Sequence, residues 1–220
     1  MEKLIHNAGD CLKAVRILVW QEDESFYKSI LCMLLSFTIY VGLIISKILD
    51  VCAFPEFMDH LWQIVKLDTR SLTIIEEQEA RSIFGNRINY RKVRIDETSL
   101  TALMRAKLKG YSGMGTTTFH TINFSRKLNT AAGNPDMKWL IHELTHVAQM
   151  EHIGSQYLVE AFHAQVGEGY AYRLGTKKHF LDYNREQQAC IVADYYIARC
   201  SGGSTAAFEP YIAELIAGKL

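Results

Sequence analysis

The longest feature of the hydrophobic pattern is an uncharged run at residues 29–46, SILCMLLSFTIYVGLIIS. As an α-helix its 18 residues would span about 27 Å, slightly less than the hydrocarbon core of a bilayer. Its few weakly polar residues do not gather on one face, so this helix would be apolar all round. Such a helix either inserts into a membrane or is buried in a core. The flanking Lys28 and Lys47 give no orientation bias, and both interpretations stay open.

After this run the chain takes on ordinary amphipathic patterns. Apolar positions at helical spacing predict helices at residues 57–65, 72–83, 99–109, 135–150, 157–171 and 183–200. Near-alternation predicts a strand or hairpin arm at residues 87–96, and β-branched and aromatic residues predict a strand at 116–125. The pattern indicates an α+β fold with a small sheet and a helical C-terminal part. We divide the chain into an N-terminal region, residues 1–70, and a second domain, residues 71–220.

Composition narrows the class of protein. Apolar residues make up 49% of the 220 residues, which is enough for a packed core. Lys plus Arg and Asp plus Glu each number 24, so the formal net charge is zero. A nucleic-acid-binding domain normally carries a basic excess, and we expect no nucleic-acid partner.

The stretch WLIHELTHVAQM contains the pattern HExxH, formed by His142, Glu143 and His146. Positions i and i+4 share a face of a helix, so the two imidazoles can hold one zinc ion. Glu143 follows His142 directly and is placed to act as a general base on a water molecule that the metal activates. Apolar residues on the remaining faces suit a helix that passes through a core.

A catalytic zinc site needs a third protein ligand. His152 lies six residues after His146, the spacing of the extended HExxHxxGxxH pattern, but Gln149 replaces the glycine of that pattern. A glutamate from a second helix is the alternative, and Glu160 and Glu186 are the candidates. The residues alone leave all three open.

Two motifs at a fitting separation, HELTHVAQ and NREQQACIVADYY, resemble bacterial zincin-like metallopeptidases found near type VI secretion and Rhs/Vgr elements. The resemblance includes ARSIFGNRINYRKVRI and TTFHTINFS, and it spans roughly residues 75–200. It implies a zincin-like fold in which a small mixed sheet packs on the HExxH helix. It also implies one zinc ion per chain, with Glu186 as the third ligand.

The resemblance leaves one departure. Thermolysin-like enzymes carry an aspartate four residues after the ligand glutamate, where this chain has Cys190. Asp194 is the nearest acidic candidate for orienting a zinc-bound histidine. Donors to a developing oxyanion would come from tyrosines such as Tyr195, and Gln149 lies on the face of His142 and could bond within the site.

For substrate binding we consider the strand predicted at residues 116–125. An edge strand can pair with an extended peptide, and the residues considered are Thr116, Phe119, Thr121 and Asn123. An internal core strand is the alternative.

The expected function is zinc-dependent hydrolysis of peptide bonds in a protein or peptide substrate. The resemblance implies a bacterial effector or toxin, made in the cytoplasm and secreted, with a secretion-system component or chaperone as a partner. A different class of function is a catalytically silent, zinc-stabilised scaffold, or an interaction protein anchored to a membrane through residues 29–46.

Overall fold

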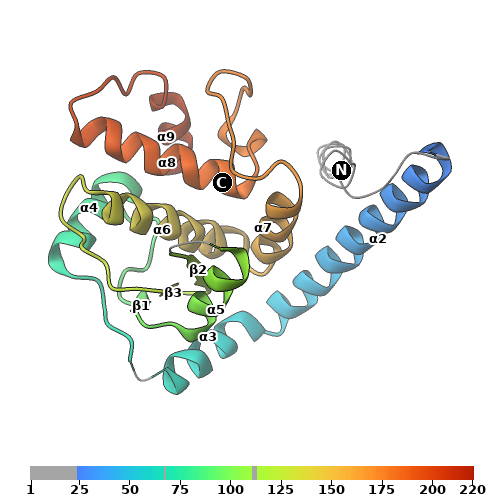
Figure 1. The fold of residues 1–220 in the computed structure, drawn as a ribbon, viewed down its shortest axis with the longest axis horizontal. Helices are drawn as coiled ribbons and strands as arrows, with labels where there is room; N and C mark the ends of the chain where they lie inside the picture. Colours follow the sequence, from blue (N-terminus) through green and yellow to red (C-terminus); the bar gives the residue numbers. More distant parts are fainter. Residues whose placement is uncertain (1–23, 67, 111–112) are drawn as a thin grey trace.

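A computed structural model describes residues 24–66, 68–110 and 113–220 (Figure 1). Residues 1–23, the start of the proposed N-terminal region, lie outside the described residues. The described elements are, in chain order, α2 (Glu24–Val51), α3 (Phe54–Val65), α4 (Ile74–Phe84), β1 (Arg94–Asp96), α5 (Leu100–Lys109), β2 (Gly115–Thr118), β3 (Thr121–Phe124), α6 (Pro135–Ile153), α7 (Gln156–Val166), a 3₁₀ turn (Phe180–Asp182), α8 (Arg185–Cys200) and α9 (Glu209–Ile216). The predicted α+β class with a small sheet and mostly helical content is confirmed.

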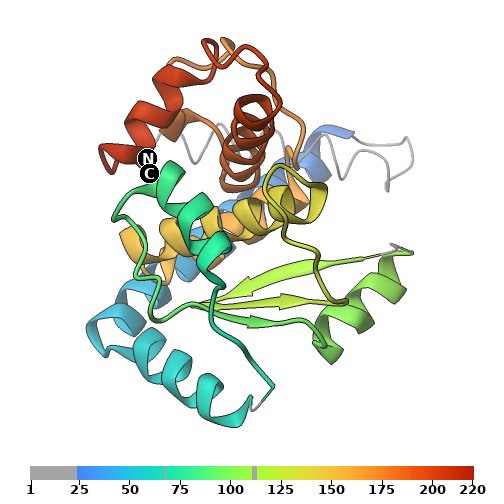
Figure 2. The same ribbon diagram turned by 90° about the vertical axis from the view of Figure 1, so that its left-hand side faces the viewer.

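Helix α6 lies at the centre of the fold. The sheet covers one side of it, and α8 and α9 lie on the other (Figure 2). The helix begins at Pro135, as expected for a proline in the first turn. The side chain of Asn134 caps it by accepting hydrogen bonds from the backbone N–H groups of Asp136 and Met137. Leu144 and Val147 are fully buried in the main core. This packing makes α6 a rigid base for the polar residues that it carries.

The sheet is mixed and has the order β1-β3-β2. β1 runs parallel to β3, and β2 runs antiparallel to it. The single strand predicted at residues 116–125 is wrong, because the chain reverses at Phe119 and His120 and forms a hairpin. Phe119 has a φ of 53°, the backbone sign that a two-residue hairpin loop requires at its first position. β3 is therefore the central strand, and β2 is an edge.

Two other boundaries differ from the pattern. Only Arg94–Asp96 of the predicted strand at residues 87–96 pairs as a strand. The preceding residues form turns, closed by bonds such as that from the backbone N–H of Lys92 to the carbonyl of Asn89. The helix predicted at 157–171 ends at Val166, because Gly167 and Gly169 follow and Gly169 has a φ of 68°.

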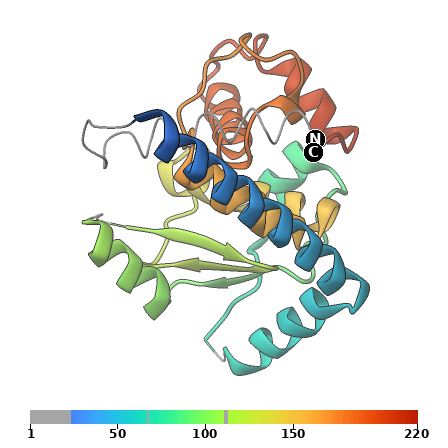
Figure 3. The same ribbon diagram turned by 90° about the vertical axis from the view of Figure 1, so that its right-hand side faces the viewer.

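Helix α2 is longer than the uncharged run and lies along α7 (Figure 3). Gly42 allows this approach, since a β-carbon there would lie 3.2 Å from a methyl group of Val159. The window Ser29–Val51 is long and apolar enough to span a membrane, and only 12% of it is buried in the described structure. Most of this apolar window is therefore exposed in the described structure.

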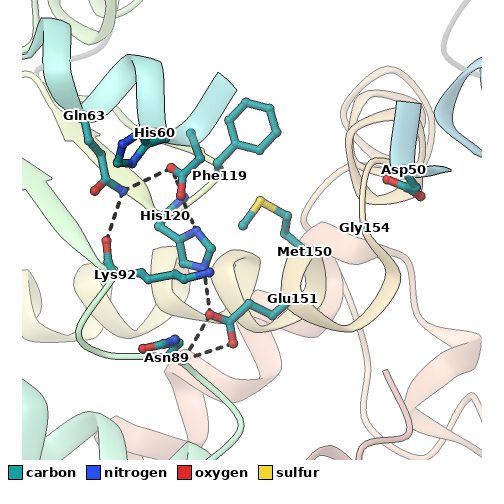
Figure 4. Close-up of a pocket in the computed structure, with 11 residues that line it drawn as sticks. Asp50, His60, Gln63, Asn89, Lys92, Phe119, His120, Met150, Glu151 and Gly154 are labelled. Atoms are coloured by element: carbon teal, nitrogen blue, oxygen red, sulfur yellow. Dashed lines mark hydrogen bonds and ion pairs between the residues drawn. The ribbon is translucent and has the colours of Figure 1, made fainter. Parts of the chain in front are cut away.

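His120, at the tip of the hairpin, joins three elements through two ion pairs (Figure 4). Its Nδ1 lies 2.6 Å from Asp59 of α3, and its Nε2 lies 2.7 Å from Glu151 of α6. Burial would lower the pKa of His120, but the two carboxylates outweigh it and raise the pKa to about 9. His120 is therefore a buried cation at neutral pH that ties α3 to the hairpin and to α6.

Replacing His120 with glutamine is expected to destabilise the fold by about 3 kcal/mol at pH 7, because the buried carboxylate of Asp59 and the partly exposed one of Glu151 lose their cation. Since the pKa is raised from 6.5 to about 9, this stabilisation is complete below pH 6.5 and is lost as the pH rises through 9. Urea unfolding at pH 7 and pH 10 checks this, and the difference between wild type and variant should shrink at pH 10. His179→Gln, in an exposed pair with Glu214, is the matched control and should have little effect.

Candidate metal centre and its surroundings

The structure brings His142, His146 and Glu186 together. The Oε2 atom of Glu186 lies 3.4 Å from Nε2 of His142 and 3.2 Å from Nε2 of His146. The two histidines are one helical turn apart on α6, and Glu186 lies in the first turn of α8, which packs on α6. Among the described residues this is the only such group of three or more potential ligands.

This donor set fits a zinc ion. Two imidazole nitrogens and one carboxylate oxygen are a known ligand combination of catalytic zinc sites. Ligand atoms at 2.0–2.1 Å from a tetrahedral ion lie about 3.3 Å apart, close to the separations between Glu186 and the imidazoles. Apart from its approach to the two imidazoles, the buried Oε2 atom of Glu186 has no hydrogen-bond partner in the described structure. A buried carboxylate oxygen normally has a partner, and a metal ion would provide one.

Two glutamines hold Glu186 and His146 through the side-chain atoms that face away from the cluster. Gln165 of α7 donates to Oε1 of Glu186 at 2.8 Å, which leaves Oε2 to face the imidazoles. Gln149 accepts at 2.9 Å from Nδ1 of His146 and donates to Gln188 at 2.8 Å. In the neutral imidazole, an acceptor at Nδ1 leaves the Nε2 lone pair of His146 directed at the site. Gln149, which we considered for a bond within the site, contacts His146, whereas no sequence signal marked Gln165.

Cys190 takes the place of the aspartate that the resemblance implied. Its Sγ lies 3.9 Å from Nδ1 of His142. Burial, and then the charges of Asp194 and Glu186, raise the pKa of this thiol to about 12. The thiol therefore stays neutral at physiological pH and is a weaker partner for His142 than a carboxylate would be.

The electrostatics of the cluster favour a cation. Burial alone would raise the pKa of Glu186, but the two imidazoles outweigh it and hold the pKa of that carboxyl well below its usual range. Burial would lower the pKa of His146, but Glu186 outweighs it and raises the pKa to about 9. Protons compete with a metal ion for the imidazole nitrogens, so metal affinity should weaken as the pH falls.

Glu143 is buried beside the cluster and is fixed by the edge strand. The hydroxyl of Thr117 in β2 donates to Oε2 of Glu143 at 2.8 Å. The same strand approaches α6 closely at Gly115, where a β-carbon would lie 2.6 Å from Oε1 of Glu143 and 2.7 Å from Nε1 of Trp139. Only glycine fits at this position without a shift of its neighbours. Neither Gly115 nor Thr117 was predicted from the sequence, because a contact between a strand and a distant helix leaves no periodic signal.

A pocket of about 760 Å³ opens beside His142 and Glu143. Gly115 of β2 forms one wall, and aromatic side chains contribute Trp139, Tyr170 and Tyr172. The hydroxyl of Tyr172 donates to Asp194 at 2.5 Å, and Lys138 pairs with the same carboxylate at 2.6 Å. The pocket therefore places apolar walls and a few polar groups next to the candidate metal ligands.

Four other residues predicted for the site make their contacts outside the cluster of His142, His146 and Glu186. His152 is exposed, and Glu160 pairs with Arg185 at 2.6 Å, so neither approaches the two imidazoles. Asp194 lines the pocket, but its described contacts are with Tyr172 and Lys138 rather than with a histidine of the cluster. Tyr195 packs on Phe208 instead.

The residues predicted to bind substrate divide between an edge and the interior. Thr116 lies on the edge strand β2 and is partly exposed. Thr121 and Asn123 are buried on the central strand β3, and Phe119 lies in the hairpin loop. Because β3 pairs on both sides and Arg70 already bridges Ile95 on the outer edge of β1, an added strand would pair with β2. Of the four residues, only Thr116 therefore keeps a place in strand pairing.

No protein-family model matches the chain. Over 148 residues, 63% of this chain, it is 32% identical to the type VI secretion system spike protein VgrG2b of Pseudomonas aeruginosa. The match covers 14% of that protein, so the chain spans a small part of its curated relative's length.

The fold is similar to that of the solved effector domain of Pseudomonas aeruginosa VgrG2b. The TM-score is 0.50 at 22% sequence identity, and the alignment covers 94% of this chain and 93% of that domain. Together the two similarities link the chain to the Vgr elements of type VI secretion.

Proposed function

We propose that this protein is a zinc-dependent peptidase. The observation that carries the proposal is the buried Oε2 of Glu186, which faces the imidazoles of His142 and His146 and has no other partner. Glu143 lies beside these residues at the pocket, as a general base must. We assign His142, His146 and Glu186 as ligands of one zinc ion per chain.

The chain's own residues provide the remaining chemistry. A zinc ion supplies Lewis-acid polarisation and lowers the pKa of water toward about 7. Glu143, held by Thr117, takes the proton of the attacking water and passes it to the leaving amine. The exposed edge of β2 offers backbone groups to an extended peptide beside Glu143. Gln165 and Gln149 hold Glu186 and His146 in place during this sequence.

The similarity to an effector domain of VgrG2b supports a place for this peptidase in secretion. We propose that the protein is delivered as an effector and acts on a protein substrate outside the producing cell. A secretion-system component or chaperone would then be its first partner.

A catalytically silent scaffold is the alternative, in which zinc only stabilises the fold. A closed site with four protein ligands would favour it. The described cluster offers three ligands and borders an open pocket, which supports the peptidase instead.

Metal removal tests the proposal directly. Protein purified without chelators is expected to contain about one zinc per chain by plasma mass spectrometry and to cleave members of a random peptide library. Treatment with 1,10-phenanthroline should abolish cleavage, and added zinc should restore it. Zinc at one per chain with no cleavage of any peptide would favour the scaffold.

The exposed apolar surface of α2 supports a second role, insertion into a lipid bilayer. Met33, Phe37 and Ile44 are among the exposed side chains of this helix, and 12% of its apolar window is buried. The helix packs against α7 on one side, so its remaining surface would meet acyl chains if α2 entered a membrane.

Vesicle flotation checks this role. The full chain is expected to float with phosphatidylethanolamine–phosphatidylglycerol vesicles, whereas Phe37→Asp combined with Ile44→Asp should remain in the dense fractions. A matched double variant on α5, Leu100→Asp with Leu108→Asp, also replaces exposed apolar residues and should float like wild type. Equal flotation of the α2 variant would rule out insertion through this helix.

A further inference from the structure

Two buried glutamines, Gln149 of α6 and Gln188 of α8, form a hydrogen-bonded pair next to His146. Their exposed fractions are 0% and 1%. A side-chain amide has two N–H protons that donate and one oxygen that accepts, and buried polar groups are normally paired. The partners around these two amides therefore determine which way each amide points.

Two backbone carbonyls of the 3₁₀ turn and the residue after it fix the orientation of Gln188. Its Nε2 donates to the carbonyl of Phe180 at 3.0 Å and to that of Tyr183 at 3.1 Å. Carbonyl oxygens only accept, so a reversed amide would place its own oxygen against two acceptors and leave them without a donor. The Oε1 atom of Gln188 therefore points away from these carbonyls.

The orientation of Gln188 in turn fixes that of Gln149. Oε1 of Gln188 accepts from Nε2 of Gln149 at 2.8 Å, and the same Nε2 donates to the carbonyl of Arg185 at 3.0 Å. Both N–H protons of Gln149 are then used, and its Oε1 lies 2.9 Å from Nδ1 of His146. An amide oxygen cannot donate, so in the neutral imidazole Nδ1 carries the proton and Nε2 carries the lone pair.

The first turn of α8 strengthens this arrangement. The guanidinium of Arg185 only donates, and its Nη1 contacts the same Oε1 of Gln188 at 3.1 Å. Nδ1 of the other imidazole, His142, instead faces the thiol of Cys190 at 3.9 Å, and a thiol is a weak acceptor. The two amides therefore hold His146 more firmly in one tautomer than the thiol holds His142.

We propose that Gln188 is a positioning residue of the metal centre, which fixes the amide of Gln149 and thereby holds neutral His146 in the tautomer that binds zinc through Nε2. The proposal rests on the zinc site proposed above. Because bonds within the protein fix both amides, the lone pair of His146 faces the site before a metal ion arrives. A ligand that is already oriented loses less conformational freedom on binding, so zinc should bind more tightly.

The test compares the zinc affinities of Gln188→Met and Gln188→Glu in the full chain, by competition with a chromophoric chelator. Methionine has a similar length but no amide, so Gln149 is free to turn and zinc should bind about 10-fold more weakly. Glutamate keeps an acceptor for Gln149, and its zinc affinity should stay within about threefold of wild type. Equal weakening in both variants would mean that Gln188 only ties α8 to the 3₁₀ turn, and would overturn the proposal.

Gln63→Met is the matched control for Gln188→Met. It also removes a glutamine that joins two segments through a backbone carbonyl, since Gln63 of α3 donates to the carbonyl of Lys92 at 3.2 Å. Gln63 has no contact with the metal cluster among its described hydrogen bonds. The zinc affinity of this variant should equal that of wild type.

NMR of the isotope-labelled, zinc-loaded wild type gives a second readout that does not depend on the folding of a variant. The proton on Nδ1 of His146 and both amide protons of Gln149 should exchange slowly with solvent, because all three are buried and hydrogen-bonded. Fast exchange of the Gln149 amide protons, or a wild-type zinc affinity in Gln188→Met, would overturn the role of Gln188 and leave the peptidase intact. A wild type that binds no zinc would overturn the metal centre and the role of Gln188 together.

Discussion

Replacing Glu143 with glutamine is expected to leave about one zinc per chain and to lower peptide hydrolysis by about 10²–10⁴-fold. Glutamine is isosteric with glutamate but cannot take a proton from water, so the general-base contribution is lost. The metal should remain, because Glu143 is not a member of the ligand cluster. Zinc content by plasma mass spectrometry and initial rates on one cleaved peptide, measured on the same preparation, check both parts.

The matched control is Glu77→Gln on α4, which removes an exposed carboxylate paired with Arg81 and should leave the rate unchanged. Thr117→Val gives an intermediate case. It removes the donor that orients Glu143 while keeping the carboxylate, so a partial loss of kcat is expected. Turnover of Glu143→Gln at the wild-type rate would contradict the assignment of the general base.

The sequence predicted the central helices well, because apolar periodicity and helix-start residues lie within each helix itself. The HExxH helix begins at Pro135, and α8 begins at Arg185, close to the ranges that periodicity gave. The hairpin was missed because residues 116–125 are uniformly rich in β-branched and aromatic residues and contain no glycine or asparagine at the turn. Phe119 adopts a positive φ there without the residue types that usually mark it.

The candidate site likewise contains residues that sequence spacing predicts and residues that only tertiary packing brings in. His142 and His146 are one turn apart, so sequence spacing alone pairs them. Helical phase also explains why Tyr195 lies away from the cluster. It follows Glu186 by nine residues on α8. At about 100° per residue it points to the opposite side of α8 from the ligand. Gln165 and Gly115 come from other elements, and their roles arise only when α7 and β2 pack against the two helices.

The choice of Glu186 over the other acidic candidates also needed more than spacing. Residues alone left His152, Glu160 and Glu186 open, and the resemblance favoured Glu186. In the structure, α6 continues to Ile153, so His152 remains helical and does not turn back toward His146. Glu160 is held by Arg185. The pairing of α6 with α8 therefore leaves Glu186 as the carboxylate at the cluster.

Replacing Glu186 with alanine is expected to weaken zinc binding by more than about 100-fold. Loss of a partner outside the ligand set already costs about 10–100-fold in metal affinity, and Glu186 is proposed as a ligand itself. Because a metal that binds only the folded state stabilises it by mass action, added zinc should raise the thermal midpoint of wild type. The variant should show no such rise and no peptidase activity.

His152→Ala is the control for Glu186→Ala, since it removes the alternative ligand from an exposed position and should keep both zinc and the zinc-dependent rise in midpoint. The reverse pattern, zinc retained without Glu186 and lost without His152, would mean that the chain after α6 rearranges around the metal. In that case the buried Oε2 of Glu186 would need another cation beside it. Protonated His146 would be that cation, because its pKa is raised to about 9. Measuring the zinc content of wild type at pH 6 and pH 8 distinguishes a metal ion at the two imidazoles from a protonated His146. A metal that displaces protons from the imidazoles binds more tightly at the higher pH.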